Sequence, residues 1–235
     1  CLPINEDGEF LELELEGKTV AGKEMLDTFE YYVRKAAKSP DTTDDYATDV
    51  LWYAWAGDRS PLFGRDKMTT FERYYISDNQ THKEKRNPYF SMREDEKLVE
   101  KILAAFGLSS RQAKIVNGHT PVKVKKGENP VKANGRLIVI DGGMSEAYRE
   151  ATGIAGYSLL NNSYGFQIVT HQPFESIGEL FRKGKDETSL KHMIDGKLER
   201  TLIKDTTIGL AIQQQIDLLL EVVDYIHDYE AQLDD

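Results

Sequence analysis

A single histidine, His119, lies in the stretch "IVNGHTPVKVK" at 115–125. It follows a short apolar run of the kind that forms a strand, and it sits between Gly118 and a Thr-Pro pair. The glycine permits an unusual backbone angle and close approach, and Pro121 restricts the exit of the turn. Such a turn can hold an imidazole at a fixed point, and neutral imidazole is a common ligand for Zn, Mn, Fe and Ni. The pattern alone fits a metal ligand or an ordinary turn histidine.

Basic residues are concentrated in two stretches of the chain. Residues 111–136 contain seven Lys and Arg but one acid, Glu128, and "HKEKR" forms a second cluster at 82–86. One interpretation is solvated lysines on edge strands, which discourage aggregation. The other is a cationic mouth that attracts an anionic small molecule. The formal net charge of −10 argues against a general nucleic-acid-binding protein.

The elements that would position these residues follow from hydrophobic periodicity and turn signals. Short strands are predicted at 114–117, 121–125, 136–140, 157–161 and 166–170, with a hairpin turn in "NNSYG" at 161–165. Alternation at 8–22 predicts a hairpin that turns at Gly17, and 57–75 reads as a loop with no clear period.

Three helices are predicted before the strands and one after them. The first spans 23–38. The second spans 42–57 with Thr42 or Thr43 as its cap, and the third runs from a Ser91/Glu94 capping box to about 106. A long apolar helix at 206–233 would be capped by Asp205 or Thr206. Its acidic end at 234–235 opposes the helix dipole and should fray.

The length and composition of the chain limit the classes of protein to which it can belong. The chain has 235 residues, which allow one large domain or two small ones, and it is 40% hydrophobic. It contains no apolar run of transmembrane length and no signal-peptide pattern. Cys1 is the only cysteine, which fits a reducing cytoplasm and excludes an intrachain disulfide. Its position suggests a lipidated first residue, a residue left after removal of a tag, or the start of a C-terminal piece.

The chain resembles a known family over essentially its whole length. The most specific part runs from "IVNGHTPVKVKKGENP" to "RLIVIDGGMS", and "HKEKRNPYF", "MTTFERYYI", "SPLFG" and "TDVLWYAWAG" add to it. These stretches resemble the class III fructose-1,6-bisphosphatases of bacteria, which are calcineurin-like two-metal phosphoesterases.

The resemblance implies a fold, an activity and a cofactor. The fold is mixed α/β: part of a two-sheet sandwich flanked by helices, with the 114–170 strands in one sheet and a long C-terminal helix. The activity is hydrolysis of fructose 1,6-bisphosphate to fructose 6-phosphate in gluconeogenesis, with a divalent metal, most favourably Mn²⁺.

The resemblance also implies that the metal site is shared with sequence outside this chain. The family's metal motifs are Asp-x-His, Gly-Asp-x-x-Asp-Arg, Gly-Asn-His-Glu, His-Gly and a final Gly-His. Only the last is present, and "GDRS" at 57–60 lacks the following Asp-Arg. We therefore expect residues 1–235 to be the C-terminal portion of a metallophosphatase domain, with a helical region (22–106), a strand-rich region (114–170) and a C-terminal helix (206–233). His119 would supply one metal ligand, the upstream portion or another chain would complete the site, and this chain alone would be inactive.

A sugar bisphosphate needs one anion site at the metals and another farther away. By analogy with related phosphatases, Arg59 could hold the scissile phosphate, and Asp141 before Gly142 and Gly143 could bind a sugar hydroxyl. Each residue also has a purely structural interpretation. Arg59 could cap a helix or pair with Asp58, and Asp141 could simply stabilise a turn. The candidates for the remote phosphate, each with solvated surface as its alternative, are Lys83, Lys85, Arg86, Lys123 and Lys125.

Two further readings compete with the enzyme portion. One is a noncatalytic anion-binding or regulatory module, and the other is a surface lipoprotein that begins at Cys1. The enzyme reading predicts a cytoplasmic protein that binds a sugar bisphosphate, contacts neither nucleic acid nor membrane, and could form a homo-oligomer. It also places His119 at a strand-end turn, partly exposed in a concavity bordered by residues 141–145.

Overall fold

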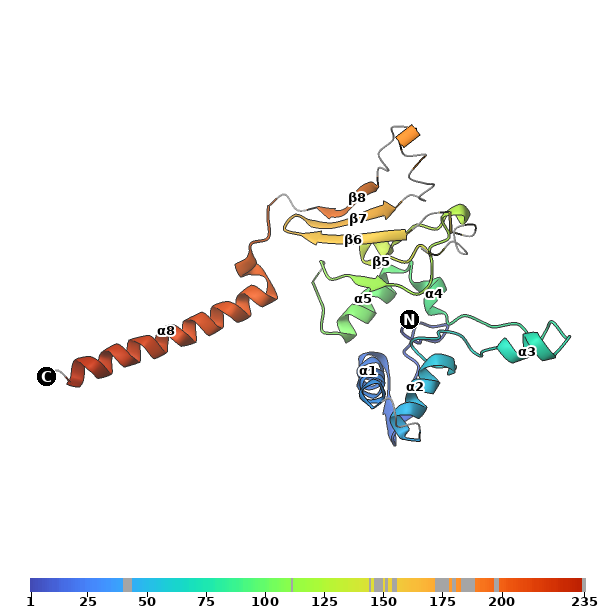
Figure 1. Cartoon of the computed structure of the whole chain (residues 1–235), viewed down its shortest axis with the longest axis horizontal. Coiled ribbons are helices and arrows are strands. Elements are labelled where there is room, and N and C mark those ends of the chain that lie inside the picture. The colour runs from blue at the N-terminus through green and yellow to red at the C-terminus, as the bar shows by residue number, and fades with distance from the viewer. Residues whose placement is uncertain are drawn as a thin grey trace. The chain divides into compact units, whose positions relative to one another are not determined.

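The computed structural model describes residues 1–39, 44–110, 112–143, 145, 150, 152–153, 156–171, 178, 181–182, 189–196 and 199–233. The chain divides into two compact units, Cys1–Ile154 and Ala155–Asp235 (Figure 1). Both helices and sheets are present, as the predicted mixed α/β class requires. The assignment of the whole chain to one metallophosphatase domain stays a prediction. No helix among these residues is both long and apolar enough to span a membrane.

The first unit begins with a hairpin and a helix pair. Strands β1 (Leu13–Leu15) and β2 (Lys18–Val20) pair antiparallel around the predicted turn, and α1 (Gly22–Lys38) packs against α2 (Tyr46–Ala56). The shared core contains Met25 and Phe29 from α1 and Val50 from α2. The predicted cap of α2 was wrong, because the side chain of Asp45 accepts the Thr48 amide at 2.8 Å and α2 begins at Tyr46. Thr42 and Thr43 lie outside the described residues.

Three shorter helices follow. The stretch expected to be a loop contains α3 (Thr70–Tyr75), and the third predicted helix is divided into α4 (Tyr89–Met92) and α5 (Glu96–Ala105). Asp95 caps α5 through the Lys97 amide at 2.9 Å. The predicted Ser91/Glu94 capping box was therefore wrong, since the Ser91 hydroxyl instead donates to the Pro88 carbonyl.

A small mixed sheet carries the His119 turn. Strand β3 (Ile115–Asn117) runs parallel to β5 (Leu137–Val139), and β4 (Val131–Lys132) pairs antiparallel on the other side of β5. All three β5 side chains are buried, so β5 anchors the sheet. The strand predicted at 121–125 was wrong, because Val124–Lys126 form a 3₁₀ turn, η1, that closes at Gly127 with φ of 77°. A second 3₁₀ turn, η2 (Ala133–Gly135), links β4 to β5.

The second unit holds a separate antiparallel sheet. Strands β6 (Gly156–Asn162), β7 (Gly165–His171) and β8 (Leu190–Gly196) pair in chain order, and β6 and β7 meet at the predicted hairpin turn. Strand β8 was not predicted. The described strands between 114 and 171 thus belong to two sheets, which corrects the expected single sheet.

The predicted C-terminal helix is present as α8 (Thr207–Leu233), after the 3₁₀ turn η3 (Ile203–Asp205). Thr206 caps it by accepting the Gly209 amide at 3.0 Å, which is one of the two predicted caps. The predicted fraying at Asp234 and Asp235 lies outside the described residues.

Candidate functional site

His119 occupies a strained turn directly after β3. Its φ is 65°, in the left-handed region that non-glycine residues rarely adopt, and the Thr120 amide donates to the Gly118 carbonyl across it at 2.8 Å. The unusual backbone angle thus falls on His119 itself and not on Gly118, where the sequence had placed it. Such strain costs about 1–3 kcal/mol and persists where the surroundings enforce it.

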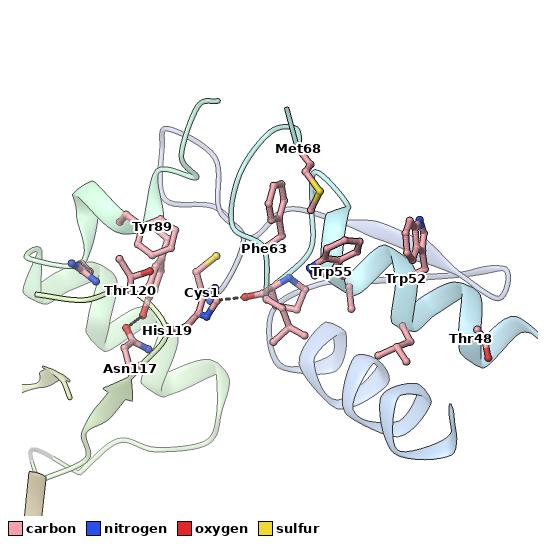
Figure 2. Close-up of a pocket in the computed structure, with 17 residues that line it drawn as sticks. Cys1, Thr48, Trp52, Trp55, Phe63, Met68, Tyr89, Asn117, His119 and Thr120 are labelled. Atoms are coloured by element: carbon pink, nitrogen blue, oxygen red, sulfur yellow. Dashed lines mark hydrogen bonds between the residues drawn. The ribbon is translucent and has the colours of Figure 1, made fainter. Parts of the chain in front are cut away.

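The surroundings that enforce this turn centre on Asn117, the last residue of β3. Its carbonyl accepts the Ile140 amide at 2.9 Å, and its side-chain oxygen accepts the hydroxyl of buried Tyr89 at 2.5 Å (Figure 2). Burial raises the pKa of Tyr89, so the hydroxyl keeps its proton and remains a donor. The turn that presents His119 is therefore fixed from both its backbone and its side-chain neighbours.

A cavity of about 340 Å³ opens beside His119. It brings His119 together with two of the predicted phosphate contacts, Arg86 and Lys123. Neither Arg86 nor Lys123 forms an ion pair with a carboxylate of the described residues; the Arg86 guanidinium instead lies over the Phe90 ring, 5.6 Å from its centroid. The remaining lining residues are Phe63, Arg65, Phe90, Thr120, Pro121 and Thr152.

Arg65 reaches this cavity because two loops pair through it. Arg65 and Arg86 form an isolated antiparallel bridge, and the Arg65 guanidinium forms an ion pair with Glu84. Burial alone would raise the pKa of Glu84, but hydrogen bonds from Thr69 and then Arg65 outweigh it, so the pKa is lowered. Glu84 therefore stays ionised and orients Arg65, while Arg86 and Lys123 keep their charge available to a ligand.

The backbone of Lys123 is held by Glu128. The Glu128 carboxylate accepts the Lys123 backbone amide at 3.0 Å and pairs with buried Arg93 at 2.5 Å and buried Lys132 at 3.4 Å. Burial would raise the pKa of Glu128, but the Lys123 amide and the two cations outweigh it and lower that pKa. This buried network fixes the start of the turn that carries Lys123.

A second and larger cavity of about 860 Å³ adjoins the first at His119, Thr120, Phe63 and Phe90 (Figure 2). Its far wall comes from α2, where Trp52 and Trp55 pack edge to face with ring centroids 5.0 Å apart. Both rings are more than half exposed. His119 therefore stands where a cationic cavity meets an aromatic one, which confirms the predicted exposed position at a strand-end turn.

Two predicted ligands to the sugar or the scissile phosphate lie apart from the cationic cavity. The Arg59 guanidinium donates to the Glu12 carbonyl at 2.6 Å instead of capping a helix or pairing with Asp58. The Asp141 side chain accepts the Gly143 amide at 2.9 Å, and its carbonyl accepts the Val122 amide at 2.8 Å. The described lining of either cavity at His119 does not include residues 141–143 or 145, so the predicted border at 141–145 was wrong for the described residues, and Met144 is outside them.

Three predicted phosphate contacts also lie outside that lining. Lys85 pairs with Glu6 at 2.7 Å, and this hydrogen bond raises the Lys85 pKa. The Lys125 ammonium donates to the Glu150 carbonyl at 2.6 Å, and Lys83 is exposed. The structure does not bring these three side chains, or those of Arg59 and Asp141, together with His119. Their proposed roles in substrate binding stay predictions.

The described residues fit one ligand position of a metal centre and no more. His119 presents an exposed imidazole on a rigid turn, which suits a single nitrogen ligand. No cluster of three or more His, Cys, Asp or Glu side chains suited to a metal exists among the residues that the structure describes. These residues alone therefore do not fit a complete two-metal site.

Sequence reasoning missed Arg65, Thr120, Thr152 and the aromatic rings of the cavity. Arg65 belongs to "FGRDK", a loop without periodicity, and it carried no signal apart from its charge. Only the long-range bridge to Arg86 shows that the two arginines share one cavity.

Comparison with known proteins adds to this geometry. Residues 1–228 match the family model described as Firmicute fructose-1,6-bisphosphatase. Three curated relatives from Staphylococcus aureus, strains MSSA476, MW2 and JH9, are named fructose-1,6-bisphosphatase class 3. Each is 51% identical over 219 residues, which cover 93% of this chain and 34% of the relative. The chain thus spans 34% of the length of the curated relatives it matches. No solved structure matches it significantly.

Proposed function

The chain belongs to the Firmicute fructose-1,6-bisphosphatase family, and we propose that it supplies part of the active site of such an enzyme. The complete protein hydrolyses fructose 1,6-bisphosphate to fructose 6-phosphate and phosphate, as part of gluconeogenesis in the cytoplasm. The observation that carries this proposal is the cavity in which a strained His119 meets three cationic side chains, Arg65, Arg86 and Lys123.

His119 acts as a nitrogen ligand to one divalent ion, most favourably Mn²⁺, together with ligands outside the described residues. When bound, the metal supplies positive charge at the phosphoryl group that reacts. The positive φ of His119 supports this role, because backbone strain is concentrated at functional positions. The single ligand also supports inactivity of the 235-residue chain by itself, which a phosphate-release assay with added Mn²⁺ would measure.

The cationic cavity binds the phosphate that does not react. Arg86 presents a planar fork of donors that matches two phosphate oxygens, and Lys123 adds a point charge. Arg65 contributes positive charge while Glu84 holds it in place. Phe63, Phe90 and Pro121 line the same cavity and reduce access of water, which strengthens these charge interactions.

Steady-state kinetics of the complete protein test this assignment. Arg86→Ala and Lys123→Ala should each raise KM for fructose 1,6-bisphosphate about tenfold, because a hydrogen bond to a charged group contributes roughly 1.5–3 kcal/mol. The same changes should alter KM for a sugar monophosphate much less. Lys83→Ala removes an exposed lysine from the neighbouring cluster and is the matched control, with KM unchanged. Equal effects on both substrates would refute the remote phosphate site, and absence of hydrolysis by the wild-type protein would refute the activity.

A further inference from the structure

Helix α8 carries a large apolar surface that the other described residues of the second unit leave exposed. Nine of its large apolar side chains belong to one broad face, and each is 43–73% exposed. These are Ile208, Ile212, Ile216, Leu219, Leu220, Val222, Val223, Ile226 and Tyr229. A helix with such a face is normally covered by another element.

The spacing of the central residues identifies the kind of element that fits. Ile212, Ile216, Leu219, Val223 and Ile226 follow one another at alternating intervals of four and three residues. This is the a/d repeat of a coiled coil, in which each side chain enters a hole on a facing helix with the same repeat. Residues 216 and 223 are the a positions, and 212, 219 and 226 are the d positions.

Between residues 212 and 226 the charges of α8 lie away from this seam. Asp217, Glu221 and Asp224 occupy the outward b and f positions, and no Lys or Arg follows Lys204 in the chain. Two copies of the helix can therefore meet along residues 212–226 without bringing like charges together, and Glu230 at the next a position marks the end of the apolar seam. A partner recognised by its positive charge would instead meet the opposite side of the helix.

We propose that α8 is a self-association element that pairs with α8 of a second copy of this chain. Nine side chains that are about half exposed present on the order of 800 Å² per copy, which is the area each partner contributes to a standard stable interface. The apolar e and g positions Leu220 and Val222 widen the face, so a bundle of more than two copies is compatible with the same seam.

The side chains at 218 and 219 provide a matched pair of variants. Leu218 lies at an outward c position and is 62% exposed, whereas Leu219 lies on the seam and is 64% exposed. Both variants replace a leucine by an aspartate, and the two leucine side chains are about equally exposed in a single copy. Only burial of the seam makes one of them more harmful than the other, and the measured mass separates a second copy from another segment of the same polypeptide.

The test is the mass of the complete protein by light scattering after size-exclusion chromatography. We expect a multiple of the chain mass for the wild type and for Leu218→Asp, and an at least twofold lower mass for Leu219→Asp. Leu219→Asn should give partial dissociation that increases on dilution, and circular dichroism should confirm that each variant is folded. A wild-type monomer, or a folded seam variant that keeps the wild-type mass, would overturn the proposal. The second outcome would mean that another segment of the same polypeptide covers α8.

Discussion

The two cavities that meet at His119 differ in size and in chemistry. The larger cavity, of about 860 Å³, is lined by tryptophans and other apolar side chains. The smaller cavity, of about 340 Å³, is lined by three cationic side chains. The largest apolar pocket is the usual first candidate for a small-molecule site. Here the smaller cavity is the better match to a phosphate, because its charges are positioned by a paired Glu84 and a half-buried Glu128. Selection by cavity volume alone would therefore favour the other side of the histidine.

The largest effect should come from the residue that both cavities share. His119→Ala in the complete protein should lower kcat about 1,000-fold, because loss of a metal ligand removes several kcal/mol and each 1.4 kcal/mol is tenfold in rate. Manganese bound per chain, measured by elemental analysis, should fall in parallel. His192→Ala, at an exposed position of β8, should change neither quantity.

A second variant at the same position separates chemistry from strain. His119→Gly should lose activity as completely as His119→Ala, but it should unfold at a higher temperature, since glycine accepts a φ of 65° at little cost. The expected gain over alanine is about 1 kcal/mol. Equal stability of the two variants would show that the turn is not strained.

The network beneath Lys123 should be the next most sensitive feature. Glu128→Gln should lower the free energy of unfolding by roughly 3 kcal/mol, because it leaves buried Arg93 and Lys132 with weakened pairing. Denaturant unfolding measures this change. Glu30→Gln, in an exposed pair with Arg34 on α1, should lower it by less than about 0.5 kcal/mol.

The lowered pKa of Glu128 also predicts a direction for the pH dependence of stability. The stabilisation should be complete above the ordinary carboxyl pKa of 4.5 and should be lost as the pH falls through the lowered folded value. Wild type and Glu128→Gln should therefore differ most near neutral pH and converge in acid. A difference that stays constant between pH 7 and pH 3 would contradict the assignment.

The boundary between the cavities should tolerate little added volume. A Cβ at Gly64, where φ is 65°, would lie 2.8 Å from the Phe90 ring and 3.0 Å from the Cys1 sulfur. Gly64→Ala should destabilise the protein by about 1–2 kcal/mol. Because Phe90 lines both cavities, KM for the bisphosphate should rise as well. Gly17→Ala offers a control at the same kind of backbone angle but in open space, so it should leave KM unchanged.

The aromatic cavity should matter least for the phosphate substrate. Trp52 is 66% exposed and lies on the far wall, away from Arg86 and Lys123. Trp52→Ala should change KM for fructose 1,6-bisphosphate by less than about twofold, an effect below 0.5 kcal/mol. A tenfold rise would instead assign part of the substrate to the larger cavity.

The sequence predicted those parts of the fold and of the candidate site that local signals define. Three features could be predicted because each depends on residues close together in the chain. They are the Gly-His-Thr-Pro turn, the neighbouring basic residues and the long helix. Arg65 was missed because only a bridge between two irregular loops brings it to Arg86. The strand expected at 121–125 failed because Gly127 closes a 3₁₀ turn there and Glu128 accepts the Lys123 amide. Long-range pairing and buried ion networks leave no periodic pattern in a single sequence.

The central claim is that the cavity beside His119 binds a phosphate through Arg86 and Lys123. Isothermal titration of inorganic phosphate into the complete protein, with metals removed by a chelator, measures that binding without the metal site. We predict that combined Arg86→Ala and Lys123→Ala weakens phosphate binding at least tenfold, as expected for loss of about 1.4 kcal/mol or more, while Lys83→Ala leaves it unchanged. Equal affinity in the wild type and the double variant would contradict the account.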